Sequence, residues 1–416
     1  MSSTRRGDQT YLAWVILAVI VLVSFATRGL RFGFGLFITP LVEEFGWGYS
    51  EVALSLSLFA LISGLLQPLI GELVDRWGGG AIMTIGTLLM GAALALSSFV
   101  HDLWQLYLTL GVLAGIGFSG LTAVSTGAVL NAWFPERRGT ALGISSAGVN
   151  TGQLLLGPLV GFLILSVGWR SSFLLIGIPL ALVLAPIAWL GTRARYPQNP
   201  EPSGRSSPAG GGGDGLGGGV LRDAFRRDDF RRLALGLFGC GFLMQMIFTF
   251  LPTMVLLWGG TKALGGIAVG VLGGCAILGS MLSGTLSDRY PRRTVLALIY
   301  FARIPLVVLA LSVHSLWALM VFAVGMGLMG FGTVGLTSAL TADQFGTGSF
   351  GRVYAFIFLS HQVGAFLGTY LGGLALDLTG SFTIPLIAGM IISMGSGFLS
   401  LGLPAWSAGA RVQASA

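Results

Sequence analysis

Twelve stretches of about twenty or more predominantly apolar residues follow one another along this chain of 416 residues. A helix of about 20 apolar residues crosses a bilayer core about 30 Å thick, so each stretch is long enough to span a membrane. The runs are continuous and far longer than the roughly 10-residue alternating strands of a transmembrane β-barrel. The sequence therefore predicts an all-α membrane protein with twelve transmembrane helices, near residues 12–42, 51–74, 80–99, 103–132, 140–166, 169–191, 232–258, 263–286, 294–313, 315–341, 352–376 and 382–404.

The charged residues are too few for a protein that folds in water. Only 9% of the chain is charged, whereas about a quarter of a soluble domain is. No cluster of nucleophile, base and oxyanion donors, and no set of metal ligands, is found in or between the spans. The two cysteines, Cys240 and Cys275, form no CxxC pair. We therefore expect no enzymatic activity, no cofactor and no bound metal.

The positions of the basic residues predict the orientation in the membrane. Lys and Arg in short loops favour the cytoplasmic side. With a cytoplasmic N-terminus, 18 of the 23 basic residues lie inside and only Arg170 and Lys262 lie outside, which leaves three within spans. We expect a multi-pass protein of the cell (inner) membrane with both termini cytoplasmic. The basic composition then reflects topology, not a nucleic-acid partner.

A long polar segment divides the spans into two sets of six. It runs from Thr192 to Arg232 and contains a glycine-rich run at 210–219, a composition typical of flexible connectors. No Gly-Lys-Ser/Thr follows that run, as a phosphate-binding loop would require. The expected organisation is an N-terminal six-helix half (1–191), a cytoplasmic linker (192–231) and a C-terminal six-helix half with a short tail (232–416).

The two halves repeat a loop motif. Residues 71–78 after the second span read GELVDRWG, and residues 284–293 after the eighth read GTLSDRYPRR, 213 residues later. Duplicated six-helix halves are typical of transporters in which one half rocks against the other around a central site.

The loop motif, the twelve spans and the central linker together resemble the major facilitator superfamily over nearly the whole chain. The resemblance implies that Gly71 allows close helix packing and that Asp75 and Arg76 form a cytoplasmic charge relay favouring the outward-open state. It implies the same roles for Gly284, Asp288 and Arg289. Alternatively, Asp75 and Arg76 only cap and anchor a helix end. The basic pair that usually follows the motif is replaced by glycines at 79–80 and kept at 292–293.

Three arginines lie within predicted spans: Arg28 and Arg31 in the first and Arg303 in the ninth. An intramembrane charge costs about 2.5–3.5 kcal/mol at the helix centre and is a functional-site hypothesis by default. No Asp or Glu lies deep in any span. A substrate anion could supply the missing negative charge, so the predicted cargo is anionic.

Arg28 and Arg31 are three residues apart, on one face of a helix, and an arginine fork binds a carboxylate bidentately. One of the two could instead extend toward the outer surface. For Arg303, a structural role between helices and a substrate role remain equally open.

Polar residues in other spans complete the expected site. His361 is the one histidine deep in a span, and its imidazole titrates near neutral pH. It would carry a proton or offer a second, switchable contact to the anion, or else serve as a neutral packing residue. Asn150 and Gln153 could line a polar cavity, although such residues also form ordinary hydrogen bonds between helices.

Within the superfamily, the first span (RFGFGLFITP, 31–40, followed by EEFGW) resembles the bacterial monocarboxylate-transporter and oxalate/formate-antiporter branch. The resemblance places Arg31 near the position of that branch's helix-1 lysine and His361 near a helix-11 cation. Ser280 stands where a helix-8 arginine is usual, and the helix-8 aspartate is absent.

These observations predict a secondary transporter of small organic anions, specifically monocarboxylates in proton symport, that works by alternating access as a monomer. Anion exchange satisfies the same electrostatics. Proton-coupled drug or metabolite efflux within the same superfamily is the main alternative, although the fourth span lacks the arginine typical of such exporters. A non-transporting receptor is the alternative from another class, but the chain has no sizeable soluble output domain.

Overall fold

The computed structural model describes residues 2–134, 137–192, 224–330 and 332–404, and within these ranges all regular secondary structure is helical. The predicted fold class is confirmed. Most of the predicted linker, from 193 to 223, lies outside the described residues. In chain order the elements are α1 (Ser2–Arg31), η1 (Phe34–Phe37), α2 (Ile38–Phe45), α3 (Tyr49–Leu65), α4 (Gln67–Trp77), α5 (Gly79–Ser97), α6 (Leu103–Leu106), η2 (Tyr107–Leu113), α7 (Ala114–Ser119), α8 (Ala123–Trp133), α9 (Arg138–Pro179), η3 (Leu180–Leu184), α10 (Ala185–Thr192), α12 (Asp228–Leu257), α13 (Lys262–Arg289), α14 (Arg292–Ser312), α15 (Leu316–Gly330), α16 (Gly332–Thr379) and α17 (Thr383–Leu401).

Nine helices in the described ranges are long and apolar enough to cross a membrane, or ten if the bent pair α3 and α4 counts as one span.

Two of the longest helices are each broken by a glycine. Gly168 interrupts α9 at φ 79°, and Gly346 interrupts α16 at φ 74°. Only glycine adopts this left-handed backbone at no steric cost. The breaks fall between predicted spans 5 and 6 and between predicted spans 10 and 11.

The first predicted span, by contrast, is not one continuous helix. α1 ends at Arg31, and the chain continues through the 3₁₀ turn η1 into α2. The turn lies where the backbone approaches α12 closely, because a Cβ added to Gly35 would stand 2.1 Å from the carbonyl oxygen of Thr249. The predicted span over 12–42 therefore consists of three consecutive elements, because this close approach requires glycine and a tighter turn.

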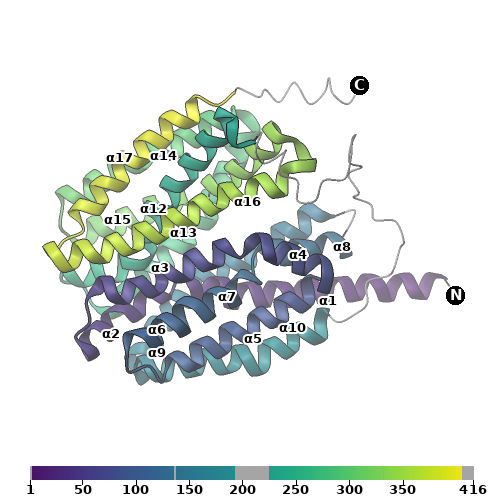
Figure 1. The fold of residues 1–416 in the computed structure, drawn as a ribbon, viewed down its shortest axis with the longest axis horizontal. Helices are drawn as coiled ribbons and strands as arrows, with labels where there is room; N and C mark the ends of the chain where they lie inside the picture. Colours follow the sequence, from purple (N-terminus) through teal and green to yellow (C-terminus); the bar gives the residue numbers. More distant parts are fainter. Residues whose placement is uncertain (1, 135–136, 193–223, 331, 405–416) are drawn as a thin grey trace.

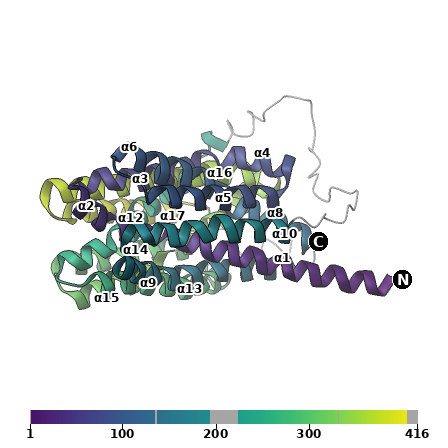
Figure 2. The same ribbon diagram turned by 90° about the horizontal axis from the view of Figure 1, so that it is seen from below.

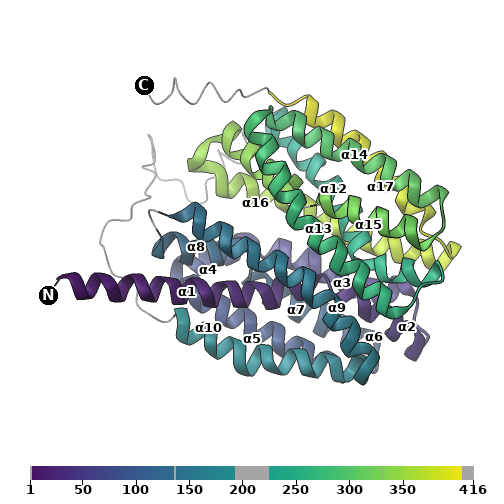
Figure 3. The same cartoon turned by 180° about the vertical axis from the view of Figure 1, so that it is seen from behind.

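The helices form two groups that lie side by side. The N-terminal group comprises α1 to α10 and the C-terminal group comprises α12 to α17 (Figure 1). Most helices of both groups run along the long axis of the molecule (Figure 2). The groups meet where α3 packs against α16 (Figure 1) and where α9 packs against α13 (Figure 3).

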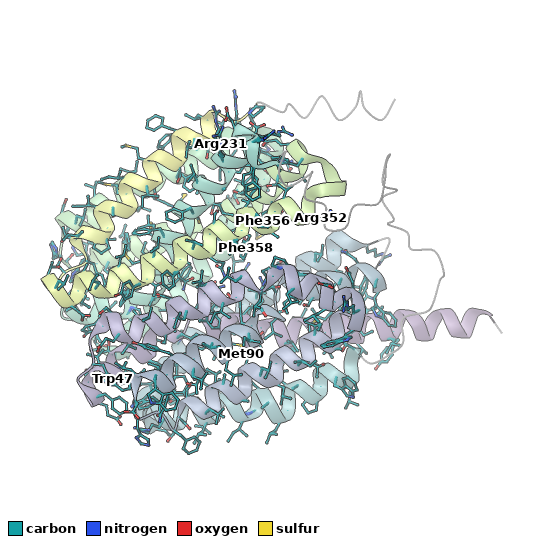
Figure 4. The ribbon with its side chains drawn as sticks, viewed as in Figure 1. Trp47, Met90, Arg231, Arg352, Phe356 and Phe358 are labelled. Atoms are coloured by element: carbon teal, nitrogen blue, oxygen red, sulfur yellow. The ribbon has the colours of Figure 1, made fainter. Side chains whose placement is uncertain are left out.

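The two ends of the bundle differ in charge. Arg231 and Arg352 lie toward the end from which α1 projects, and Trp47 lies toward the other (Figure 4). We call the first the arginine-rich end. The second, the arginine-poor end, carries Arg170 and Lys262.

Hydrogen bonds and an ion pair join the two groups at the arginine-poor end. Nζ of Lys262 lies 2.6 Å from Oε2 of Glu43. Asp377 at the end of α16 accepts hydrogen bonds from the backbone N–H groups of Tyr49 (2.7 Å) and Ser50 (2.8 Å), which begin α3. A carboxylate at a helix N-terminus is favourable because the first N–H groups lack partners within the helix. The arginine-poor end is therefore closed.

Candidate substrate-binding site

Arg31, the last residue of α1, lies where the two groups meet. Its Nη2 donates a hydrogen bond of 3.2 Å to Oε1 of Gln245 on α12, in the opposite group. The guanidinium carbon lies 5.0 Å from the ring centre of Phe118 and 5.6 Å from that of Phe59. Cation–π contacts of this kind contribute about 0.5–2 kcal/mol each and leave the guanidinium's hydrogen-bond donors available.

The internal repeat shows that Arg31 lies near the axis relating the groups. Arg31 and Gln245 are 214 residues apart, and Thr39 and Thr253, whose hydroxyls are 3.5 Å apart, are also 214 residues apart. This separation matches the 213-residue repeat of the loop motif within one residue. Positions related by a two-fold axis touch each other only close to that axis. Transporters with such repeats bind substrate where the repeats meet.

The positive charge of this region has no carboxylate partner. None of the six ion pairs found among the described residues includes Arg28 or Arg31. Nε of Arg31 is buried without a hydrogen-bond partner, and Arg28 makes no hydrogen bond or ion pair within the described ranges. Two guanidiniums therefore lie at one helix end, and none of the described residues provides an anion for them.

Gln153 and Asn150 lie on α9, which faces α13 of the other group. The Gln153 side chain is fully buried, and neither its Oε1 nor its Nε2 has a hydrogen-bond partner within the described structure. It packs against Gly273, where an added Cβ would meet its Cγ at 2.5 Å. Asn150 is half-buried one turn earlier. Gln153 is therefore an amide between the groups with unused donor and acceptor atoms.

His361 connects the groups through its neighbour Gln362. Nδ1 of His361 lies 3.2 Å from Oε1 of Gln362, and the imidazole stacks on Phe358. Nε2 of Gln362 donates across to the carbonyl oxygen of Ala60 (3.2 Å) and to Oγ of Ser63 (2.9 Å), both on α3. The structure places His361 beside an inter-group contact and does not bring it into contact with Arg31.

Arg303 lies entirely within the C-terminal group. It is fully buried, and its Nη2 donates to the carbonyl oxygens of Met329 (2.7 Å) and Gly330 (3.4 Å). The guanidinium carbon is also 5.2 Å from the ring centre of Tyr300. These partners join α14 to α15, so Arg303 contacts residues of its own group and none of the residues around Arg31.

The repeated loops are exposed at the arginine-rich end. Arg76 pairs with Glu72 at 2.5 Å, one turn away on α4, and not with Asp75. Asp288 and Arg289 are likewise exposed. A Cβ added to Gly71 or to Gly284 would meet nothing within 4 Å. The close packing expected at both glycines is therefore not formed in this conformation, because the groups do not meet at this end.

Sequence reasoning missed the aromatic residues around the arginine. Phe59 and Phe118 are two of 27 phenylalanines, and no local pattern distinguishes them from core residues. The repeat spacing, by contrast, relates Gln245 to Arg31.

Both the sequence and the fold are similar to those of known transporters. The model of the Major Facilitator Superfamily matches residues 17–302 and 233–406. The MFS-type transporter YcxA of Bacillus subtilis (strain 168) is 29% identical, over 92% of this chain and 93% of its own. Monocarboxylate transporter 11 of Mus musculus is 28% identical, over 94% and 87%. A bacterial homologue of the human lysosomal transporter Spinster, solved inward-facing and unoccupied, superposes with a TM-score of 0.75 at 18% identity, covering 95% of this chain and 99% of its own. With twelve predicted spans, a repeated loop motif and a family match along nearly its whole length, this multi-pass membrane protein belongs to the major facilitator superfamily of transporters.

Proposed function

We propose that the protein is a secondary transporter of small organic anions, specifically monocarboxylates, that works by alternating access. The observation that carries the proposal is Arg31, which lies near the axis between the groups, has no carboxylate partner among the described residues and retains a buried, unpaired Nε. Arg28 adds positive charge beside it. The relatives named monocarboxylate transporters support the same substrate class.

The surroundings of Arg31 favour a singly charged acid with an apolar tail. Phe59 and Phe118 are almost fully buried and bring apolar surface directly against the guanidinium. A second carboxylate would have to be desolvated against these rings, which is unfavourable. Gln245 and Gln153 offer amides that can bond a hydroxyl or keto oxygen next to the carboxylate.

Alternating access requires the contacts at the arginine-poor end to break when the opposite end closes. If the arginine-rich end faces the cytoplasm, with both termini inside and the bundle in the cell's inner membrane, this conformation faces inward. Closing the arginine-rich end would bring the two loop motifs toward the opposite group. Asp75, Arg76, Asp288 and Arg289 would then form the charge relay, and Gly71 and Gly284 would allow close approach.

Proton symport is consistent with the electrostatics of the empty and loaded carrier. Closing the cavity around a neutralised cargo costs less free energy than closing it around a bare charge, and His361 would take part in proton coupling. Anion exchange meets the same requirement, because one anion then replaces another.

Uptake of labelled substrates into proteoliposomes tests the proposal. The panel should contain monocarboxylates with increasingly long apolar tails, one dicarboxylate and one lipophilic cation, each with and without an inward proton gradient. We expect uptake of monocarboxylates, stimulated by the gradient, and little uptake of the dicarboxylate. Uptake that requires internal anion but ignores the gradient would indicate exchange. Transport of the lipophilic cation alone would indicate drug efflux and refute the proposal.

A further inference from the structure

A buried polar cluster lies inside the C-terminal group, away from Arg31. Sγ of Cys240 on α12 lies 2.9 Å from Oγ1 of Thr333 on α16, and Nη2 of Arg303 on α14 donates to the same sulfur at 3.6 Å. The thiol also interacts with the side chain of His361 on α16. Cys240 is only 2% exposed and Arg303 is 0% exposed. Three helices thus bring a thiol, an imidazole and a guanidinium together away from solvent.

The cluster contains a positive charge that lacks a fixed counterion. Nε and Nη1 of Arg303 have no hydrogen-bond partner within the described structure, and no carboxylate pairs with it there. The other titratable groups that face the thiol are the phenols of Tyr300 and Tyr354, whose hydroxyls donate to the carbonyl oxygens of Gly236 (2.7 Å) and Val334 (3.5 Å). The segments α15 and α17 contribute no titratable side chain. A thiol ionises more readily than a phenol, so Cys240 is the group that can become the counterion of Arg303.

The hydrogen bonds of Gln362 determine which ring nitrogen of His361 carries the hydrogen. The amide nitrogen of Gln362 must point at the carbonyl oxygen of Ala60, because a carbonyl only accepts. Its oxygen then faces Nδ1 of His361, and this contact is a hydrogen bond only if Nδ1 carries the hydrogen. Nε2 is left without a hydrogen in the neutral ring and can accept one from Cys240.

We propose that Cys240 and His361 form the proton-binding site of this transporter, with Arg303 as its permanent positive charge. The proposal rests on proton-coupled transport as the function. In the deprotonated state, the Cys240 thiolate neutralises Arg303. An incoming proton binds to Sγ, and the resulting S–H group donates to Nε2 of His361. The proton stays on sulfur because an imidazolium beside a buried guanidinium would place two like charges together.

Protonation of this site changes both the charge and the interface between the groups. The cluster of Arg303, Cys240 and His361 is neutral without the proton and carries one positive charge with it, which favours entry of an anion between the groups. The same change reaches α3, because His361 bonds Gln362, and Gln362 bonds Ala60 and Ser63. By linkage, a bound carboxylate must increase the proton affinity of the site by the same factor.

The first experiment uses the fact that the chain has only two cysteines. In Cys275→Ser protein, the infrared S–H stretching band reports Cys240 alone. We expect the band to be absent at alkaline pH, to grow as pH falls, and to shift its midpoint upward by roughly one pH unit when a monocarboxylate is added. Arg303→Met should show the band at every pH. A full band at every pH in the Cys275→Ser protein itself would overturn the proposal.

The second experiment separates this proposal from the proposed function. In the Cys275→Ser background, Cys240→Ala should lose stimulation of monocarboxylate uptake by a proton gradient, by about tenfold or more, and retain exchange of internal for external anion. Unchanged stimulation would refute the role of Cys240. If the parent protein transports no monocarboxylate, the proposed function fails, and the S–H titration still decides whether Cys240 binds the proton.

Discussion

Arg31 and Arg303 are both arginines within predicted spans, and both lack a carboxylate among the described residues, yet their surroundings differ. Arg31 contacts a side chain of the opposite group and two aromatic rings of its own. Arg303 bonds backbone carbonyls and a thiol of its own group. The contacts of Arg31 with the opposite group must change when the groups move relative to each other, whereas those of Arg303 can persist. An intramembrane charge alone therefore does not identify a substrate site; the location of its partners does.

The internal repeat supports this distinction. The 213-residue spacing relates Arg303 to Met90, which is fully buried in α5 (Figure 4). The N-terminal group therefore packs the equivalent position with an apolar side chain of similar length. The fold does not require a charge at this place, so the role of the Arg303 charge lies in its interactions with the neighbouring residues.

The largest expected effect on transport comes from Arg31→Ala. Removing a charged donor from a desolvated carboxylate costs about 2–4 kcal/mol, so monocarboxylate uptake should fall roughly 30- to 1,000-fold. Uptake into proteoliposomes measures this loss, and Arg31→Lys, which keeps the charge without the fork, should retain part of the activity. Unchanged uptake by Arg31→Ala would refute the assignment of Arg31 to the substrate site.

Arg303→Met, which copies the residue of the other group, should lower stability and leave anion binding in place, in addition to its effect on the protonation of Cys240. It leaves the carbonyl groups of Met329 and Gly330 and the Thr333 hydroxyl without their charged donor, and we expect a loss of about 1–3 kcal/mol. Thermal unfolding in detergent measures the loss. Added monocarboxylate should still raise the unfolding temperature of Arg303→Met but not that of Arg31→Ala. The reverse pattern would assign substrate binding to Arg303 and a structural role to Arg31.

A smaller effect is expected from Phe59→Leu or Phe118→Leu. Each substitution removes one cation–π contact of about 0.5–2 kcal/mol and frees the guanidinium to change orientation, so the KM for a monocarboxylate should rise about 3- to 10-fold. Phe322→Leu is the matched control, because Phe322 is a fully buried phenylalanine on α15. It should lower stability without changing KM. Equal KM values for all three variants would show that the rings near Arg31 only fill space.

The smallest effect is expected at Arg170, an arginine that does have a carboxylate partner. Trp169 and Arg170 donate to the carboxylate of Glu44 at 2.5 and 2.9 Å, and these bonds outweigh partial burial and lower the pKa of Glu44. The stabilisation is therefore complete above the unfolded pKa of about 4.3 and is lost as pH falls through the lower folded pKa. Because the pair is partly exposed, Glu44→Gln should cost less than about 1 kcal/mol near neutral pH. The difference in unfolding temperature from wild type should vanish in acid.

Several features were predictable from the sequence because they depend on local composition. The apolar runs predicted the helices, and the breaks at Gly168 and Gly346 fall at predicted boundaries. The rarity of charges within the spans identified Arg28, Arg31 and Arg303 without any structure. The position of the break after Arg31 depends on how closely Gly35 approaches the α12 backbone, which is a tertiary contact.

The partners of these residues were beyond the sequence because they come from distant parts of the chain. Nothing around position 59 or 118 indicates that two phenylalanines lie against a guanidinium, and nothing near Cys240 indicates a neighbouring arginine 63 residues away.

By itself, the sequence determined that this chain is a membrane protein of duplicated six-helix halves with an uncompensated positive charge inside. Hydrophobicity and repeat spacing are properties of the linear sequence, so they can be determined without knowing which helices pack together. Only the tertiary structure decided that Arg31 faces the other group while Arg303 is enclosed in its own. That distinction depends on which helices pack together, because a buried charge must be satisfied by whichever groups the packing brings within hydrogen-bonding distance.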